Sequence, residues 1–524
     1  MVLVRFDAQK LIDFSGVSKE NLLEVPWLLG GESRVEGGTV IMEFNPDRPD
    51  LYSFQGISRA MRIFNGIEKF SMPAIREEDM EMHSNPPSER PYFSGGIVRG
   101  VKIKNLIPEV IDFQEKLHLT IGRNRKVSAI GLHDLRKVKF PLLYRGVGRG
   151  EKFRPLGSDD EVQLEYFMKN DPKALEYGHL VGENVPAILD STGEIISLPP
   201  ILNSSITTVT EETEDLFVDV TGTNQNVVQR TLILMLTSLA YPSGTIGTVR
   251  LDGYRVPKIE IQEKDISPLS IKKMLGYGLS AEEISGALSK LGYGYKDGRA
   301  IIPIYRTDIL GEVDILEDIF KGIGFDKIKR MKEGFVGYGK ASPLRAIENK
   351  LRELLVGYNL NETVSSVLVN SRYSSLYGAK ENGLRIVNPI SQEQDSIRTG
   401  ISPSLMQTFL NNFRNPYPQR IFEIGTVYAG GKEKDVLGIG IADKNASFSE
   451  IKGIFVGVLE DLGVENYVIT RSEEGMYTPG RVGGIDIGGK RVGFFGEVHP
   501  KILKEIGIKM PVAMGELEVL GVVS

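Results

Sequence analysis

The spacing of apolar and polar residues predicts helices and short strands that alternate along most of the chain. Apolar positions recur with helical spacing in three long segments: 107–119, 224–239 and 344–360. Short β-rich runs lie between the first two, including a strand at 215–223 and two strands within 185–204, joined by a turn at 190–193. Residues 76–91 are charged and rich in proline, which predicts a linker. The pattern therefore predicts several mixed α/β domains.

Two distant parts of the chain resemble each other. The matching segments are 16–22 with 278–284, 29–30 with 291–292, 48–51 with 306–309, and 57–61 with 315–319. The offset is 262 residues until a four-residue slip precedes the third pair. Each copy predicts a Ser-capped helix, a glycine stop, a short strand, an Arg-x-Asp turn and a second helix. Ser280 and Glu283 form a capping box, whereas the first copy has only the Ser18 cap. We interpret the similarity as a duplicated module, with chance similarity as the alternative.

The second copy is distinguished by its acidic residues. Within 305–319 (YRTDILGEVDILEDI) these are Asp308, Glu312, Asp314, Glu317 and Asp318. Asp308 aligns with Asp50, so it is predicted to serve the turn common to both copies. The residues of the first copy that align with Asp314, Glu317 and Asp318 are Gly56, Arg59 and Ala60. The module therefore does not need acids at those three positions in order to fold.

Positions 314, 317 and 318 are predicted to share one face of a helix. The opposite, buried side is predicted to carry Ile315, Leu316, Ile319 and Phe320. Carboxylates on one stripe repel each other unless a cation or a basic partner neutralises them. Oxygen ligands without nearby His or Cys favour magnesium or calcium over zinc. The alternative is a solvated helix start, whose acids interact only with the helix dipole.

Composition restricts the class of protein. A length of 524 residues predicts three or four domains, and the absence of cysteine excludes disulfides, thiol nucleophiles and zinc–thiolate sites. No apolar run approaches the roughly 18 residues of a membrane span, and the N-terminus is not a signal peptide, so we expect a cytoplasmic protein. The net charge of −6 implies that any contact with nucleic acid is local or shared with a partner.

Most familiar catalytic signatures are missing from the sequence. It contains no Walker phosphate loop, GxSxG elbow, HExxH motif or kinase motif set. The glycine-rich 146–150 (GVGRG) is predicted to be a loop. His133 and Asp134 are an acid/base pair in one interpretation, but adjacent side chains rarely point together. We favour a structural or substrate-orienting role for His133.

Taken together, these segments resemble the beta subunits of phenylalanyl-tRNA synthetase of the archaeal and eukaryotic type. The stretches that carry the resemblance occur in the family's order and cover essentially the whole chain. They are EFNPDRPDLYSFQGISRAMRIF, AIGLHDLRKV, LPPILNS with DVTGT, IYRTDILGEVDILEDIFKGIGFDKI, and NPISQEQDSIRTGISPSLMQTFLNNF followed by RIFEIGTVY.

The resemblance implies a mixed α+β multidomain fold with two related small helix-rich modules. The expected domains are an N-terminal module (1–85), a mixed α/β editing domain that deacylates tRNA (86–258), a second helix-rich module (259–335) and a catalytically inactive domain (336–524). The last is expected to have the antiparallel sheet of class II synthetases. The duplicated module corresponds to the first and third of these domains.

The resemblance also implies a cofactor and partners. Family members bind magnesium through acids spaced D-x5-D-x2-E-[E/D], which fall here on Asp308, Asp314, Glu317 and Asp318. The glycine-rich class II motif with its ATP-binding arginine is absent, so phenylalanine activation is expected of the alpha subunit. The expected assembly has two alpha and two beta subunits, with tRNA(Phe) as substrate, and ATP and phenylalanine bound through the alpha subunit.

An editing site is the chemistry expected of this chain itself. Tyrosine differs from phenylalanine by one hydroxyl and is hard for an apolar pocket to reject, so a second, hydrolytic site is useful. By resemblance, the candidate pocket residues are Leu198, Asn203, Ser204, Asp219, Thr221 and His133. Asp219 or a nearby hydroxyl is expected to accept the phenol proton, while Ser204 and Thr221 orient the ester or water. For each of these residues the alternative is ordinary turn or strand-end chemistry.

Two other functions remain open at this point. One is a non-catalytic scaffold that assembles the alpha subunit and binds tRNA while its editing site is degenerate. The other is a free-standing single-chain synthetase, which the missing ATP motif opposes.

Overall fold

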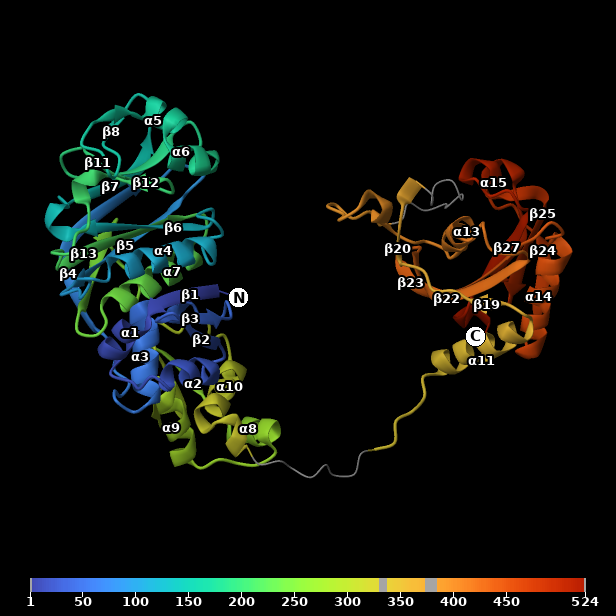
Figure 1. Ribbon diagram of the computed structural model, residues 1–524, viewed down its shortest axis with the longest axis horizontal. Coiled ribbons are helices and arrows are strands. Elements are labelled where there is room, and N and C mark those ends of the chain that lie inside the picture. Colours follow the sequence, from blue (N-terminus) through green and yellow to red (C-terminus); the bar gives the residue numbers. More distant parts are fainter. Residues whose placement is uncertain (1, 329–336, 373–383, 523–524) are drawn as a thin grey trace. The chain divides into compact units, whose positions relative to one another are not determined.

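The computed structural model describes residues 2–328, 337–372 and 384–522. The chain divides into two compact units, Met1–Lys332 and Glu333–Ser524 (Figure 1). Within the described residues, none of the helices has the length and apolar character needed to cross a membrane.

The first unit contains the two copies of the duplicated module. The first copy comprises β1 (Val2–Asp7), α1 (Ala8–Ser15), α2 (Asn21–Leu28), β2 (Glu32–Glu36), β3 (Thr39–Phe44), the 3-10 helix η1 (Pro49–Tyr52) and α3 (Phe54–Phe64). The second comprises β16 (Gln262–Asp265), α8 (Pro268–Leu275), α9 (Ala281–Lys290), β17 (Gly294–Lys296), β18 (Arg299–Ile302), α10 (Glu312–Ile323) and the 3-10 helix η5 (Phe325–Lys327). Their antiparallel sheets have matching strand orders, β1-β3-β2 and β16-β18-β17.

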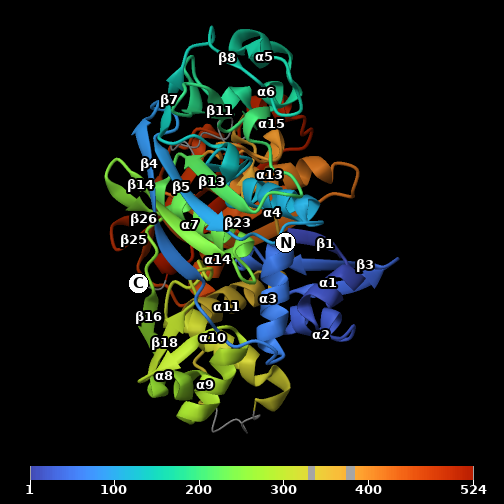
Figure 2. The ribbon, with the colours of Figure 1, turned by 90° about the vertical axis from the view of Figure 1, so that its left-hand side faces the viewer.

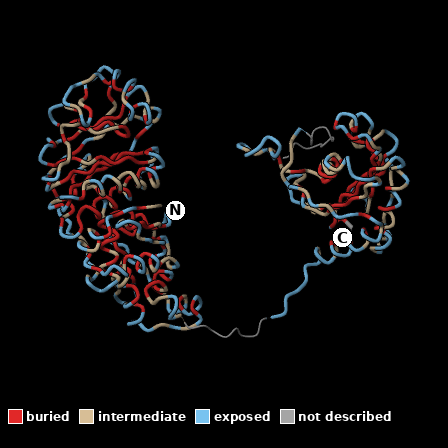
Figure 3. The backbone as a smooth tube through the Cα atoms, viewed as in Figure 1, coloured by how far each residue is buried: buried red, intermediate tan, exposed pale blue. Residues whose placement is uncertain are grey.

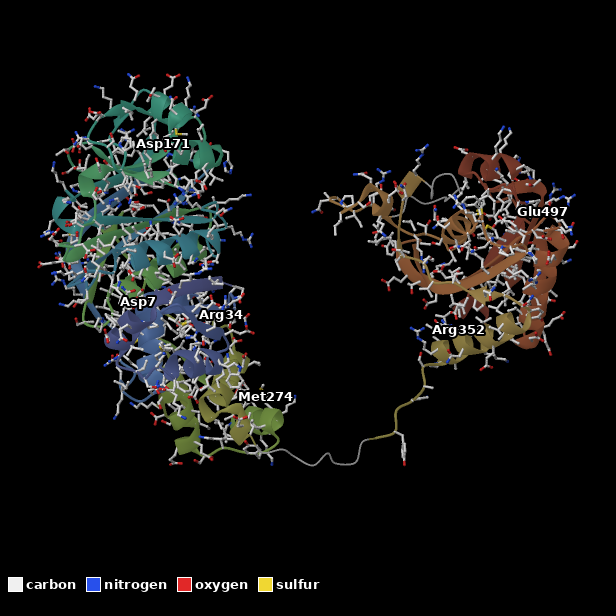
Figure 4. All side chains as sticks on the ribbon, viewed as in Figure 1. Asp7, Arg34, Asp171, Met274, Arg352 and Glu497 are labelled. Carbon is white, nitrogen blue, oxygen red and sulfur yellow. The ribbon has the colours of Figure 1, made fainter. Side chains whose placement is uncertain are left out.

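The shared element order is consistent with a duplication, and the likeness extends toward the N-terminus of each copy. Helices α1 and α8, which the sequence comparison did not pair, both end at a left-handed glycine, Gly16 and Gly276. Each is also capped at its start by a side chain, and Figure 4 labels Asp7, which accepts from the Lys10 amide at 2.8 Å. The capping box at Ser280 is confirmed. The Ser18 cap is wrong, because α2 begins at Asn21 with no side-chain cap.

A ten-stranded sheet forms the middle of the first unit. Its strands are β4 (Ala74–Asn85), β5 (Tyr92–Arg99), β6 (Ser128–Asp134), β7 (Leu142–Val147), β10 (Val185–Leu189), β11 (Ile195–Leu198), β12 (Leu202–Asn203), β13 (Asp215–Gly222), β14 (Thr245–Leu251) and β15 (Tyr254–Val256). The order is β12-β11-β10-β7-β4-β14-β5-β13-β6, with β15 beside β14. Pairing is antiparallel except that β4 runs parallel to β14 and β7. Strands β13 and β6 are buried along nearly their whole length (Figure 3).

The other elements of this domain pack around the sheet. They are α4 (Ile107–Leu119), α5 (Leu164–Asn170), α6 (Pro172–Tyr177), α7 (Gln225–Leu239), the short pair β8 (Lys152–Phe153) and β9 (Val162–Gln163), and the 3-10 helices η2 (Leu135–Lys137), η3 (Gly178–Leu180) and η4 (Ser205–Thr207). Helix α7 packs against β5 and β13, as Figures 1 and 2 show. The helices predicted at 107–119 and 224–239 are confirmed as α4 and α7, the latter capped by Asn224. The predicted turn at 190–193 is also confirmed, because Asp190 accepts hydrogen bonds from the Thr192 and Glu194 amides.

The linker predicted at 76–91 is wrong. Most of that segment is strand β4, which belongs to the large sheet. Its charges suggested a solvated chain, but Glu78 is buried and pairs with Arg76 and Arg99. Ion pairing within the sheet therefore accounts for part of the charge, and the other charged residues of β4 are exposed. Beyond β4, Arg90 is buried and binds Thr221.

The second unit contains a seven-stranded sheet in the order β19-β22-β23-β27-β26-β25-β24. These strands are β19 (Asn361–Glu362), β22 (Gln419–Ala429), β23 (Lys432–Ala442), β24 (Tyr467–Arg471), β25 (Tyr477–Ile487), β26 (Lys490–Val498) and β27 (Val512–Glu518). Pairing is antiparallel except between β19 and β22. This unit also contains a separate strand pair, β20 (Leu368–Val369) and β21 (Ser396–Ile397). Its 3-10 helices include η6 (Gln392–Gln394) and η7 (Leu520–Val522).

Helices cover both faces of this sheet. One core is built with α11 (Pro343–Gly357) and α14 (Phe448–Asp461), and the other with α13 (Ser402–Asn411) and α15 (Pro500–Ile506). The helix predicted at 344–360 is therefore α11, with shorter C-terminal bounds. The domain boundary predicted between 335 and 336 lies outside the described residues.

A close helix contact in the second module leads to a prediction. Gly322 of α10 packs on α9, and a Cβ at that position would lie 2.2 Å from the Ala287 carbonyl oxygen. The change Gly322→Ala should lower the free energy of unfolding by about 1–3 kcal/mol, because the two helices must separate. Chemical denaturation monitored by circular dichroism measures this.

The matched control is Gly286→Ala in α9, where an added Cβ meets no atom within 4 Å. It should be neutral or stabilising by up to about 1 kcal/mol, because alanine favours helix. Equal effects of the two substitutions would contradict the packing described for Gly322.

Candidate functional site

A cavity of about 360 Å³ lies beside strand β6, between helix α4 and the segment that joins β11 to β12. Its walls are mainly apolar, and they include Ile107, Val110, Ile111, Leu132, Leu202 and Leu216. Its polar lining includes Gln114, Glu115, His118, Arg125, Asn203 and Asp219. The size and the few convergent polar groups are typical of a small-ligand site.

The free edge of β6 determines which side chains surround the cavity. Among the described strands, β6 pairs with β13 only, and its other edge is unpaired. Gln114 donates to the Ile130 carbonyl at 2.8 Å, and the Ile130 amide donates to His118 Nε2 at 2.9 Å. Asn203 donates to the Leu132 carbonyl at 3.2 Å. Side chains from α4 and β12 thus satisfy backbone groups that a further strand would otherwise bind.

The carboxylate of Asp219 lines the cavity, and the buried imidazole of His133 lies behind it. His133 Nε2 lies 2.8 Å from Asp219 Oδ2, and His133 Nδ1 lies 2.7 Å from Thr207 Oγ1. The His133 and Asp219 side chains are 0% and 1% exposed. Gly131 is the register partner of Asp219, and a Cβ there would lie 1.9 Å from Asp219 Oδ2. The missing side chain at Gly131 therefore makes room for the Asp219 carboxylate.

A second polar network lies on the α4 side of the cavity. Arg125 Nη2 donates to Glu115 Oε1 at 2.7 Å, and His118 Nδ1 lies 3.2 Å from the same oxygen. Because His118 Nε2 accepts from the Ile130 amide, its proton is on Nδ1 and is donated to Glu115. Burial lowers the pKa of His118 and outweighs the opposing hydrogen bond to Glu115. Burial acts to raise the pKa of Glu115, but His118 and Arg125 outweigh it and hold that pKa at about 2.

Three of the residues predicted for this pocket line the cavity: Asn203, Ser204 and Asp219. The other three lie behind it. Leu198 is fully buried in the neighbouring apolar core, and His133 contacts the cavity only through Asp219. Thr221 instead holds Arg90, whose Nε and Nη2 donate to its side-chain and backbone oxygens at 2.7 and 2.8 Å.

His133 and Asp134 do not form an acid/base pair with each other. Asp134 accepts hydrogen bonds from Arg136 and Thr213, whereas His133 is bound by Asp219 and Thr207. Sequence reasoning did not identify Glu115, His118 or Arg125 as site residues. The spacing of Glu115 and His118, one helical turn apart within a predicted helix, was the available signal.

The acids of α10 do not converge on one point. Arg306 binds Asp308 through Nε and Nη2 at 2.9 and 2.7 Å, and its Nη1 lies 2.6 Å from Asp318 Oδ2. Tyr293 also donates to Asp318 at 2.6 Å. Burial acts to raise the pKa of Asp318, but the charges of Arg306 and Arg48 outweigh it and lower that pKa. Arg306 therefore pairs with both of these acids, and Lys321 is a second cation beside Asp318.

The remaining acids also have partners. Asp314 accepts from the Leu310 and Gly311 amides, and Glu317 pairs with Lys321, whose Nζ also lies 3.6 Å from Asp318 Oδ1. Glu312 binds the amide of Ser267 and the hydroxyl of Ser270. In residues 2–328, 337–372 and 384–522, no three His, Cys, Asp or Glu side chains form a group that fits a metal ion. As placed, the four predicted ligands do not fit magnesium.

The helix face predicted for the acids also needs correction at one position. Asp318 is 1% exposed, whereas Glu317 is solvent-exposed. The predicted burial of Ile315, Leu316 and Ile319 is confirmed. Asp318 lies on the buried side because Arg306 and Tyr293 meet it there.

The Arg-x-Asp turn is common to both copies, as predicted. Arg48 binds Asp50 through Nε and Nη2 at 2.9 and 2.8 Å, which matches the geometry of Arg306 and Asp308. All four residues are largely buried.

Comparison with known protein families gives three matches along the chain. The B3/4 domain matches residues 96–236, the tRNA synthetase B5 domain matches 264–325, and the phenylalanyl tRNA synthetase beta chain CLM domain matches 329–519. The candidate cavity lies within the first of these regions, and the α10 acids lie within the second.

Relatives match nearly the full length. The phenylalanine–tRNA ligase beta subunit of Archaeoglobus fulgidus is 34% identical over 96% of this chain and 95% of its own. That of Pyrococcus abyssi is 34% identical over 90% and 89%. The crystal structure of an N-terminal fragment of the phenylalanyl-tRNA synthetase beta subunit from Pyrococcus horikoshii covers 61% of this chain and 99% of its own, with 31% identity and a TM-score of 0.57.

Proposed function

The chain belongs to the family of phenylalanine–tRNA ligase beta subunits, and from this we propose that it combines two tasks. It supports the ATP-dependent attachment of phenylalanine to tRNA(Phe), in a cytoplasmic assembly of two alpha and two beta subunits. It also hydrolyses tyrosyl-tRNA(Phe) that the assembly forms in error.

The domain division behind this proposal is 1–85, 86–258, 259–335 and 336–524. The B3/4 match supports editing by the second domain, and the CLM match supports a synthetase-like fourth domain. The missing class II motif with its ATP-binding arginine supports the inactivity of the fourth domain. The antiparallel sheet with helices on both faces supports a class II likeness of the fourth domain. Strand β4 begins at Ala74, so the sheet of the second domain also takes residues from before 86.

One observation carries the editing proposal: the buried Asp219 carboxylate lines a mainly apolar cavity. A phenol can donate its hydroxyl proton to Asp219 while its ring contacts the apolar walls. Phenylalanine lacks that hydroxyl and leaves the buried carboxylate with His133 alone, which disfavours its binding. The pocket is therefore suited to a tyrosyl group.

The nucleophile is proposed to be water. Both ring nitrogens of His133 and both of His118 already have hydrogen-bond partners, so neither imidazole is free to act as a base in this arrangement. The sequence has no cysteine. A water held between the pocket and the ribose of the tRNA then attacks the ester carbonyl, and the ribose oxygen leaves with a proton.

Asp219→Ala in the assembled enzyme should slow hydrolysis of tyrosyl-tRNA(Phe) by about 100-fold, because the phenol loses its acceptor. Tyrosine activation, followed by ATP–pyrophosphate exchange, should not change. The matched control is Asp134→Asn, since Asp134 is equally buried but binds Arg136 and Thr213 away from the cavity. Normal deacylation by Asp219→Ala would show that the pocket is assigned wrongly, whereas a native assembly that does not deacylate tyrosyl-tRNA(Phe) would favour the scaffold with a degenerate editing site.

The purified chain alone should form no phenylalanyl-adenylate, because its sequence lacks the class II motif that carries the ATP-binding arginine. ATP–pyrophosphate exchange with phenylalanine measures this directly. Adding the alpha subunit should give exchange together with a complex of two copies of each chain by mass measurement. Exchange by the chain without its partner would point to a free-standing synthetase.

Magnesium is proposed as the cofactor of the assembly, with Asp308, Asp314, Glu317 and Asp318 as its ligands in this subunit. The ion must then replace Arg306 at two of them. Magnesium should raise the melting temperature of the native complex but not of Asp314→Asn/Glu317→Gln, because bound ligand stabilises the folded state. Scanning calorimetry with and without magnesium tests this, and equal responses would show that these acids do not bind the ion.

A further inference from the structure

The cavity contains a second carboxylate that the editing proposal does not use. Glu115 lines it from helix α4, whereas Asp219 lines it from strand β13. The hydrogen bonds from Arg125 and His118 both end on Glu115 Oε1. No described residue donates a hydrogen bond to Oε2, and the side chain is 39% exposed. One oxygen of Glu115 thus remains available to a ligand.

The neighbours of Glu115 fix its position and its charge. Arg125 Nη1 donates to the Pro200 and Ile201 carbonyls at 3.1 and 3.0 Å, and its guanidinium stacks on Tyr177 at 4.4 Å. His118 is neutral and held by Ile130. The low pKa of Glu115 keeps the carboxylate ionised at neutral pH. A fixed anion beside apolar walls favours a ligand with a compact positive charge.

We propose that Glu115 binds the α-ammonium group of the aminoacyl ester and so orients its carbonyl for hydrolysis. This inference rests on the proposed editing function and names a specificity-determining residue for it. Asp219 is suited to a neutral donor at the far end of the substrate, since its Oδ2 is already bound by His133. The two acids then bind the two polar ends of one tyrosyl group, with the apolar walls along its ring.

The competing role for Glu115 is structural. By holding Arg125, it also fixes the Pro200 and Ile201 carbonyls at the cavity wall. Loss of that support would weaken hydrolysis of any ester. Substrates with and without an α-ammonium group therefore separate the two roles.

The experiment compares tyrosyl-tRNA(Phe) with 3-(4-hydroxyphenyl)propanoyl-tRNA(Phe), which lacks only the α-ammonium group. Glu115→Gln in the assembled enzyme should raise KM for the tyrosyl ester by about 10- to 100-fold, the effect expected of one charge-assisted hydrogen bond. Hydrolysis of the desamino ester should change less than about twofold. The control is Asp112→Asn in the same helix, because Asp112 pairs with Lys116 and does not line the cavity.

Equal loss with both esters would show that Glu115 acts only through Arg125, and no loss with either would show that it does not touch the substrate. Either result overturns the proposal. A hydrolysis-resistant probe, 3′-(L-tyrosyl)amino-3′-deoxyadenosine, keeps the test independent of catalysis. Its affinity should fall with Glu115→Gln, while that of its desamino analogue should not. If the native enzyme hydrolyses neither ester, the editing function fails, and the binding measurement still decides the role of Glu115.

Discussion

The unpaired edge of strand β6 is the constraint on which the candidate site depends. Backbone groups of Ile130 and Leu132 face away from the sheet and need partners, because buried peptide groups without hydrogen bonds are costly. Gln114 and His118 of α4 and Asn203 of β12 supply those partners. Because these side chains take the place of a further strand, the sheet ends at β6 and a cavity lies beside it. The same hydrogen bonds hold helix α4 on one side of the cavity and residues 197–204 on the other.

Comparing the two copies of the module separates residues that both copies share from residues that make a contact in one copy only. Both copies keep the Arg-x-Asp turn, so that pair belongs to the module itself. At the position of Arg59 in α3 the second copy has Glu317. Arg59 is buried, stacks on Tyr305 at 3.5 Å and donates to the Thr237 carbonyl. Glu317 is solvent-exposed and pairs with Lys321 of its own helix, which explains why opposite charges are tolerated at equivalent positions.

Local structure was predictable from the sequence, while contacts between distant segments were not. Helices α4 and α7 follow from their apolar spacing and, for α7, from the Asn224 cap. The pairing of His133 with Asp219 depends on the register of β6 and β13, which the sequence alone does not give. The sequence suggested Asp134 instead, because it is adjacent to His133. Asp318 was placed on the solvated face because helical spacing cannot reveal that Arg306 and Tyr293 approach it. Charge suggested a linker at β4, where ion pairs across the sheet support a strand.

The contact between Arg59 and Tyr305 also bears on how the chain is synthesised. Helix α3 leaves the ribosome long before its partner, since Tyr305 follows Arg59 by 246 residues. At roughly 5–20 residues per second, that delay is on the order of 12–50 seconds. During this interval the first module has its own three-stranded sheet but lacks the surface that will cover Arg59. The module must therefore remain unaggregated with this face open while the whole central domain is translated.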